Sequence, residues 1–236
     1  EVDDGTYVKA MTTIAAILFD QNADPVEYYD KAAVRLPKVV EGSRHFDRRS
    51  LVRLCIEACE NLVDCEYPED AQPYLARGLD LTARGSDAWT LNRRMELMNL
   101  SGEINDDLNA PSEAAQSYGE AIDIGMDLLE RESLEDPEDL VMSYVMRAEM
   151  EADIGMIDSY IHDIGAAITI LEHLMEFNRI PDPEILVRLH HDLAGALMKQ
   201  GNIQEAEKHL MKAMQIGISG ASDYINIHAP RDTGGQ

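Results

Sequence analysis

Small residues recur along this chain at a nearly constant step of about 45 residues. A first marker keeps intervals of 46, 46 and 43 residues, and its positions are Ala213, Ala167, Ala121 and Gly78. A second marker, small except at Tyr160, keeps intervals of 46, 46, 43 and 45 residues. Its positions are Ala206, Tyr160, Ala114, Ala71 and about Val26. Two independent markers with the same step predict an internal repeat.

Turn and cap residues divide the repeat into predicted helices. Pro25 is expected at the first position of one helix, Asp47 and Ser86 are expected to cap two others, and Pro37 is expected to end or bend a helix. Ala, Leu, Met, Glu and Ile dominate the composition, which favours helix over sheet. The predicted helices cover residues 6–20, 25–41, 47–64, 68–84, 87–108, 112–131, 137–154, 157–178, 183–200 and 203–217.

These helices pair into hairpins of two. Close packing of two helices requires Ala or Gly where they cross, which explains the recurring small residues. The predicted hairpins cover 6–41, 47–84, 87–131, 137–178 and 183–217, followed by a short cap at 219–229 and a flexible polar tail at 230–236. We therefore expect a single repeat domain over residues 1–229.

The last hairpin carries the clearest family pattern. It presents large and small residues in alternation at Leu193, Ala194, Leu197, Ala206, Leu210 and Ala213. This pattern resembles the tetratricopeptide repeat (TPR), without indicating a particular member. The step near 45 residues exceeds the roughly 34 residues of a standard TPR, so we expect TPR-like hairpins with lengthened helices. The resemblance implies an all-α, right-handed α-solenoid of about five antiparallel hairpins.

The charge balance limits the possible partners. The chain has 20 Lys and Arg residues against 45 Asp and Glu residues, a formal net charge of −25. Nucleic-acid binding requires Lys and Arg against phosphates, and no basic cluster supplies them, so we exclude that class. Insertion into a membrane is also not expected, because no apolar run approaches the roughly 18 residues that a spanning helix needs. A basic protein or peptide is the expected partner.

The cysteines indicate the compartment. Cys55, Cys59 and Cys65 are an odd number in one local stretch, unlike the even, dispersed cysteines of a secreted disulfide framework. We therefore expect a reducing compartment, the cytoplasm. The sequence begins at Glu1 without Met, which predicts a fragment or processed chain and leaves open the loss of a leader or an anchor.

Candidate catalytic or metal-binding residues are few. Cys55 and Cys59 lie one helical turn apart, but a zinc site needs four ligands, so both are expected to be structural. His190 and His191 are adjacent on a helix and point in different directions. We expect His190 in a packing position and His191 on the groove face. Known catalytic and nucleotide-binding motifs are absent from the sequence. We expect no cofactor, no metal and no enzymatic activity.

The resemblance implies a concave groove lined by the first helix of each hairpin. The polar residues at these positions are acidic in the central hairpins and basic near the C-terminal end, which predicts a ligand of basic character. TPR domains that clamp a terminal carboxylate use Lys, Arg and Asn there, and this chain mostly has Glu, so that function does not carry over. The predicted partner-binding residues are Arg53, Glu57, Glu60, Glu96, Asn99, Glu103, Asp106, Arg188, His191 and Lys199.

The resulting hypothesis is a protein- or peptide-binding scaffold that acts without turnover. Two alternatives stay open. One is a structural or self-assembly module, because the segment 219–229 carries Tyr224, Ile225 and Ile227 where a solenoid end normally needs a polar cap; a homodimer through this apolar end is the expected form. The other is a ligand-sensing or catalytic helical domain of a larger protein that uses the His and Cys residues.

Overall fold

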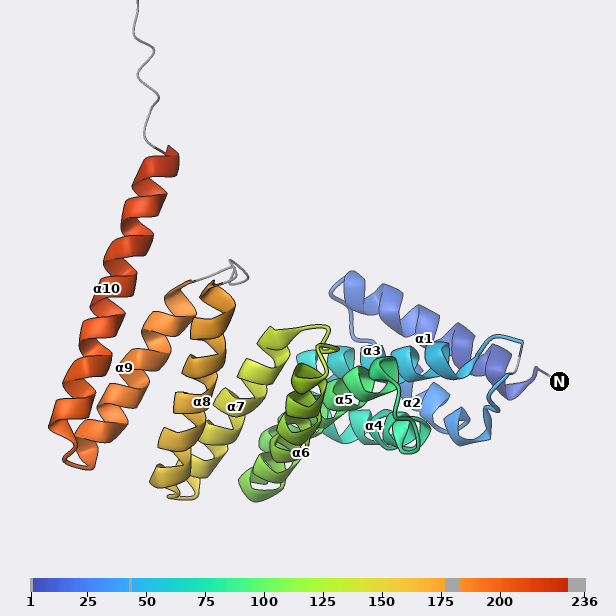
Figure 1. Cartoon of the computed structure of the whole chain (residues 1–236). Helices are drawn as coiled ribbons and strands as arrows, with labels where there is room; N and C mark the ends of the chain where they lie inside the picture. The colour runs from blue at the N-terminus through green and yellow to red at the C-terminus, as the bar shows by residue number, and fades with distance from the viewer. Residues whose placement is uncertain (1, 43, 177–182, 229–236) are drawn as a thin grey trace, which may run out of the picture. The chain divides into compact units, whose positions relative to one another are not determined.

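The computed structural model describes residues 2–42, 44–176 and 183–228 of the chain (Figure 1). Within these ranges the fold is all-α, as expected, with ten α-helices, one short 3₁₀ helix and no strand. The chain divides into two compact units, Glu1–Ile154 and Gly155–Gln236. Each unit is described by itself below. A single array over residues 1–229 therefore stays a prediction, as does its handedness.

The first unit contains seven α-helices in two layers. Its helices are α1 (Asp4–Asp20), α2 (Val26–Ala33), α3 (Arg48–Asp64), α4 (Pro68–Thr82), α5 (Ala88–Asp107), α6 (Pro111–Glu130) and α7 (Pro137–Asp153), with the 3₁₀ helix η1 (Leu36–Lys38) after α2. Helices α1, α3, α5 and α7 contact one another in that order and form one layer, while α2 contacts α4 in the other layer. Helix α6 packs against both α5 and α7.

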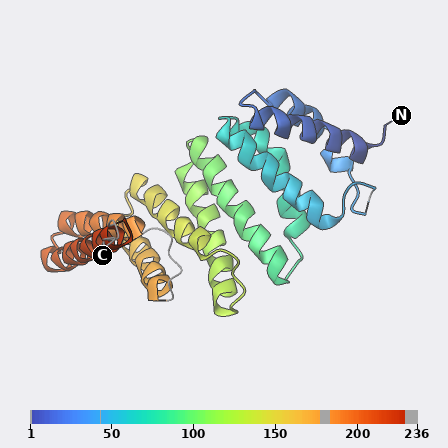
Figure 2. The ribbon, with the colours of Figure 1, turned by 90° about the horizontal axis from the view of Figure 1, so that it is seen from above.

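The second unit contains three helices, α8 (Ile157–Glu176), α9 (Pro183–Lys199) and α10 (Ile203–His228). Helix α9 packs against both α8 and α10, and Figures 1 and 2 show α9 and α10 side by side as an antiparallel pair. The hairpin predicted over residues 137–178 therefore has one helix, α7, in the first unit and the other, α8, in the second.

Aspartate side chains start several of these helices. Asp47 accepts a hydrogen bond from the Ser50 backbone N–H at 2.7 Å and so caps α3 as predicted. The prediction of Ser86 as the cap of the next helix is wrong. Asp87 is the cap, and its carboxylate accepts from the Thr90 N–H at 3.2 Å. A carboxylate is favoured here because it also meets the positive end of the helix dipole.

Five connections between helices close in the same way. In each, a residue just after the end of the helix has a left-handed backbone. The backbone N–H of the residue that follows it donates to the carbonyl five residues earlier, as in a Schellman motif. The N–H···O distances are 2.8–2.9 Å. The left-handed residues are Asn22, Glu66, Asn109, Glu132 and Gly201. The predicted Gly201-Asn202 turn is confirmed by the positive φ of +82° at Gly201.

The small residues lie where helices cross, as predicted. Ala71, Ala114, Ala121 and Ala167 are fully buried. At Gly102 on α5, an added Cβ would lie 2.5 Å from the ring of Tyr118 on α6. Real Cβ atoms do not approach so closely, so the Tyr118 ring occupies the space that Gly102 leaves free.

Two helix ends differ from prediction. The second helix of the first hairpin, predicted over 25–41, ends at Ala33 and is followed by the 3₁₀ turn that contains Pro37. Proline removes a backbone donor and clashes with the preceding turn, which explains the early end. At the other end of the chain, α10 runs on to His228 instead of ending at 217. Gly217 keeps helical backbone, since an isolated Gly only weakens a helix. The predicted tail at 230–236 lies outside the described residues.

Candidate functional site

The polar residues predicted for the groove lie on the α1–α3–α5–α7 layer in the first unit. Arg53, Glu57 and Glu60 are exposed on α3. On α5, Glu103 is exposed, whereas Glu96, Asn99 and Asp106 are half-buried. The structure thus places all seven on two adjacent helices of one layer.

Carboxylates from three helices converge on this layer. We define the acidic face as Glu57 and Glu60 of α3, Glu96 and Glu103 of α5, and Asp139 of α7. Burial, together with the smaller effects of the Glu60 and Asp139 charges, raises the pKa of Glu96 to about 7. Burial and the nearby Asp64 and Glu57 likewise raise the pKa of Glu60. These mutual shifts mean that the negative charges lie close enough to repel one another.

A single half-buried arginine lies among these acids. The Arg93 guanidinium is 3.2 Å from Glu96 Oε2 and 2.6 Å from Glu135 Oε2. It opposes the rise in pKa of Glu60, Glu96 and Asp139. Arg93, even together with the exposed Arg53 one turn before Glu57 on α3, cannot balance five carboxylates, so the acidic face keeps a net negative charge.

Sequence reasoning missed both Arg93 and Asp139. The repeat itself held a signal for them, because the 46-residue step between equivalent positions relates residue 93 to residue 139. Equivalent positions on neighbouring hairpins lie side by side in a repeat array, so an arginine at one and an aspartate at the other are expected to interact.

Asn99 also has an internal role. The Ser143 hydroxyl of α7 lies 2.7 Å from Asn99 Oδ1, where it can donate a hydrogen bond. This contact ties α5 to α7 beside the acidic face. The Asn99 side chain therefore contributes to packing in the first unit, in addition to any contact with a partner.

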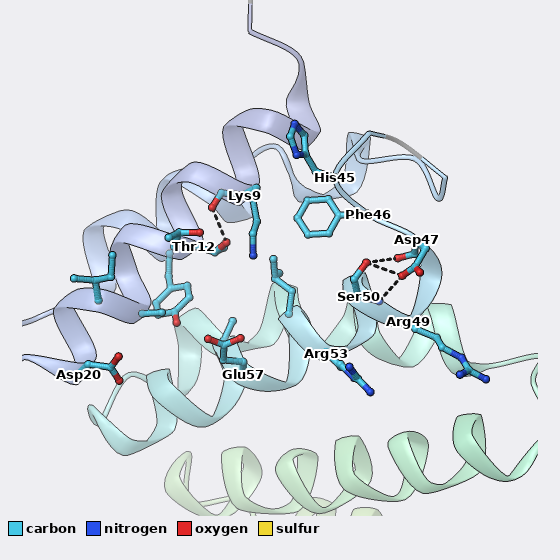
Figure 3. A pocket seen from close by; sticks show the side chains of 16 residues that line it. Lys9, Thr12, Asp20, His45, Phe46, Asp47, Arg49, Ser50, Arg53 and Glu57 are labelled. Atoms are coloured by element: carbon cyan, nitrogen blue, oxygen red, sulfur yellow. Dashed lines mark hydrogen bonds between the residues drawn. The ribbon is translucent and has the colours of Figure 1, made fainter.

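A cleft of about 620 Å³ lies between α1 and α3, at the edge of the same layer (Figure 3). Arg53 and Glu57, both predicted site residues, line it. Its floor includes the buried side chain of Phe46. Volumes of about 300–1,000 Å³ are typical of pockets that hold small molecules or side chains of a partner.

The cleft brings in residues that the sequence did not single out. Figure 3 shows Lys9 extending from α1 toward α3, while Arg49 and Arg53 extend from α3 on the side away from α1. The Arg49 guanidinium lies 4.9 Å from the Trp89 ring centre on α5, a cation–π contact. Which residues of α1 face α3 depends on how the two helices pack, so the sequence pattern alone could not identify Lys9.

The predicted residues of the last hairpin lie in the second unit. Arg188, His191 and Lys199 are all exposed on α9. His190 is fully buried, which confirms its predicted packing position.

In the first unit, Cys59 of α3 is fully buried as well, and burial raises its pKa well above the usual value for a thiol.

Among the side chains that the structure describes, no three His, Cys, Asp or Glu residues are arranged to hold a metal ion. Within the described ranges, every helix is either too short or too polar to span a bilayer.

Known structures resemble this fold at low sequence identity. No protein-family model matches the sequence, and no curated protein matches it. BtubC (BKLC) from P. vanneervenii matches with a TM-score of 0.66 and 16% identity over 99% of this chain and 86% of that chain. TPR-like repeats of a putative kinesin light chain from Podospora anserina match with a TM-score of 0.62 and 15% identity, covering 94% of this chain and 100% of that chain.

A Rap protein complexed with competence and sporulation factor also matches, with a TM-score of 0.53 and 13% identity. The match covers 94% of this chain and spans 57% of the Rap chain. At these identities the likeness establishes the fold alone. The small-residue markers, the repeated hairpin closures and these structural matches agree that this chain has a TPR-like helical-repeat fold.

Proposed function

We propose that this chain is a binding scaffold that holds a basic protein or peptide segment against the acidic face and acts without turnover. The observation that carries the proposal is the convergence of carboxylates from α3, α5 and α7 around Arg93. A Lys- or Arg-rich segment that docks there relieves the repulsion between the acids and gains favourable contacts. Complementary charge of this kind mainly increases association rate and specificity.

Two further observations support a scaffold. The cleft between α1 and α3 adjoins Glu57 and offers an apolar floor beside the charged surface. The similar Rap chain, by its own description, is complexed with a factor. On α9, the exposed Arg188, His191 and Lys199 remain proposed partner-binding residues of the second unit. A cytoplasmic location also stays a proposal, which rests on the odd number of clustered cysteines.

The test uses fluorescein-labelled 12-residue peptides with alternating Lys and Ala or alternating Glu and Ala. Binding to the full chain is followed by fluorescence anisotropy at 50 and 300 mM salt. We expect the basic peptide to bind, the acidic one not to bind, and affinity to fall with salt. The double variant Glu60→Lys/Glu103→Lys should weaken binding of the basic peptide by about tenfold or more.

The matched control places the same charge change on α6, which carries no residue of the acidic face. Glu120 and Glu130 are exposed on α6, so Glu120→Lys/Glu130→Lys alters the net charge equally without touching the acidic face. We expect this variant to bind the basic peptide within about twofold of the natural protein. Equal weakening by both double variants would mean that only net charge matters and would overturn the proposal.

Self-assembly is a second candidate, because α10 presents an apolar stripe. Met211, Met214 and Ile218 are 62%, 64% and 69% exposed and share one side of the helix. Sedimentation velocity from 1 to 200 μM tests this candidate. A dimer that Met214→Glu abolishes supports it, whereas a monomer throughout the range rejects it.

A further inference from the structure

Two histidines meet between α9 and α10 in the second unit. His190 of α9 is fully buried, and its Nδ1 lies 2.9 Å from Nδ1 of His209 on α10. The ring centres are 5.2 Å apart, with the planes inclined at 37°. An N···N distance of 2.9 Å is a hydrogen bond, which requires one ring to donate and the other to accept.

The surrounding charges indicate which ring donates. The second ring nitrogen of His190, Nε2, is buried without a hydrogen bond and lies 3.6 Å from Glu172 Oε1 of α8. Glu172 Oε1 also lies 2.6 Å from the Lys212 ammonium of α10. A proton on His190 Nε2 points a donor toward the Glu172 carboxylate, whereas a bare nitrogen there would be repelled. His190 therefore carries its proton on Nε2 and accepts at Nδ1 from the Nδ1–H of His209.

We propose that the His190–His209 pair is an acid-sensitive latch that holds α9 against α10 and opens when His190 gains a second proton. Protonation of His209 on its free Nε2 leaves the hydrogen bond intact, because its Nδ1–H still donates. A second proton on His190 must occupy Nδ1. Two N–H donors would then face each other at 2.9 Å, next to a buried positive charge, and the pair would have to separate.

Titratable side chains of α8, α9 and α10 influence the protonation of the pair. Burial lowers the pKa of His190 to about 4, with smaller effects in the same direction from His209, Lys212 and His191; Glu172 opposes them. Burial also lowers the pKa of His209. The Lys212 and Lys208 charges lower this pKa as well, whereas the Glu205 and Glu172 charges raise it. The folded pair thus resists protonation that the unfolded chain accepts.

The sign of the pH effect follows from linkage. A histidine whose pKa is lower in the folded state contributes stability that is complete above its ordinary pKa near 6.5. That contribution is lost as the pH falls toward about 4. Four carboxyls of the acidic face have raised pKa values, so their contribution to stability changes in the opposite direction; they are Glu60, Glu96, Glu103 and Asp139. Acid is therefore expected to loosen the α9–α10 pair, whereas protonation of these four carboxyls favours the folded first unit.

Hydrogen exchange of the full chain tests the latch. Exchange is measured by mass spectrometry at pH 7.5 and 4.5 and corrected for the intrinsic rate at each pH. We expect the opening equilibrium of α9–α10 itself to increase by about tenfold or more at pH 4.5. The variant His190→Leu/His209→Leu should remove most of this increase, whereas His191→Gln on the same helix should keep it.

Ring nitrogen spectroscopy of the natural protein gives a second readout that does not depend on a variant that folds. Long-range ¹H–¹⁵N spectra should show a proton on Nε2 of His190 and on Nδ1 of His209 at pH 7.5. An opening equilibrium of α9–α10 that is the same at both pH values would overturn the latch. So would an ordinary titration of His190 near pH 6.5, or an undiminished pH response in the double leucine variant.

Discussion

The Tyr74 hydroxyl donates a 2.7 Å hydrogen bond to the backbone carbonyl of Tyr29, 45 residues earlier in the chain. Both side chains are buried, and their rings meet edge to face at 5.7 Å. Other polar contacts in the first unit span similar separations. Ser143 reaches back 44 residues to Asn99, and the Glu135 N–H reaches back 43 residues to Asn92 Oδ1. One repeat length thus separates many partners that tie neighbouring hairpins together.

We predict that Tyr74→Phe destabilises the first unit by about 0.5–1.5 kcal/mol, because it removes a buried hydrogen bond between two neighbouring hairpins. Urea unfolding followed by the fluorescence of Trp89, the single tryptophan of the chain, measures this effect. Tyr67→Phe is the matched control. Its hydroxyl makes an exposed 3.1 Å bond to Asp24, so the same atom is removed with little expected loss. Equal losses in the two variants would contradict the role given to Tyr74.

We predict that Gly102→Ala destabilises the first unit by about 1–3 kcal/mol, since the added methyl would lie 2.5 Å from the Tyr118 ring. Gly119→Ala on α6 is the control, because its Cβ would meet only the end of the Arg147 side chain at 3.4 Å. There the higher helix propensity of Ala should add about 0.5–1 kcal/mol. Thermal unfolding of both variants distinguishes these opposite signs.

The raised pKa of Glu96, about 7, predicts a pH dependence for the first unit. A carboxyl whose pKa is higher in the folded state binds more protons when folded, so stability falls as pH rises from about 4.5 to 7. Glu96→Gln should remove about 1–2 kcal/mol of this dependence, allowing for partial exposure of the side chain. Urea unfolding at pH 5, 6, 7 and 8 provides the measurement. A slope unchanged by the substitution would show that Glu96 ionises normally.

The thiols should differ in reactivity. Cys55 and Cys59 are buried, and burial raises the pKa of Cys55 to about 12 and that of Cys59 well above its usual value. Cys65 is half-buried at the end of α3. We expect a thiol reagent such as dithionitrobenzoate to modify only Cys65 in the folded protein and all three thiols after unfolding. Rapid reaction of two or more native thiols would contradict this structure of α3.

The elements that the sequence predicted well are those with local causes. Asp47 and the Gly201 turn act within a few residues, and the small residue at Ala121 repeats at a fixed step, so their roles follow from local pattern. The extension of α10 past Gly217 was missed because weak helix breakers in sequence do not determine whether a helix ends.

The parts of the site that escaped prediction depend on packing between helices. Asp139 lies near Arg93, and Lys9 lies opposite α3. To predict either position, one must know how separate hairpins are arranged in space. The His190–His209 contact was only partly predictable from the sequence. The two residues lie on either side of the Gly201 turn, and His190 was expected in a packing position, so an antiparallel register could have suggested the pair. The direct contact between the two rings depends on how α9 and α10 pack.

The repeat-length contacts also affect how the first unit folds. Because each hairpin touches only its neighbours, the chain entropy lost in forming a contact is that of closing a loop about one hairpin long. That cost stays the same however many hairpins are stacked. Folding can begin at any well-packed hairpin and spread in both directions, so the rate should depend little on the length of the array and remain that of a protein with mainly local contacts.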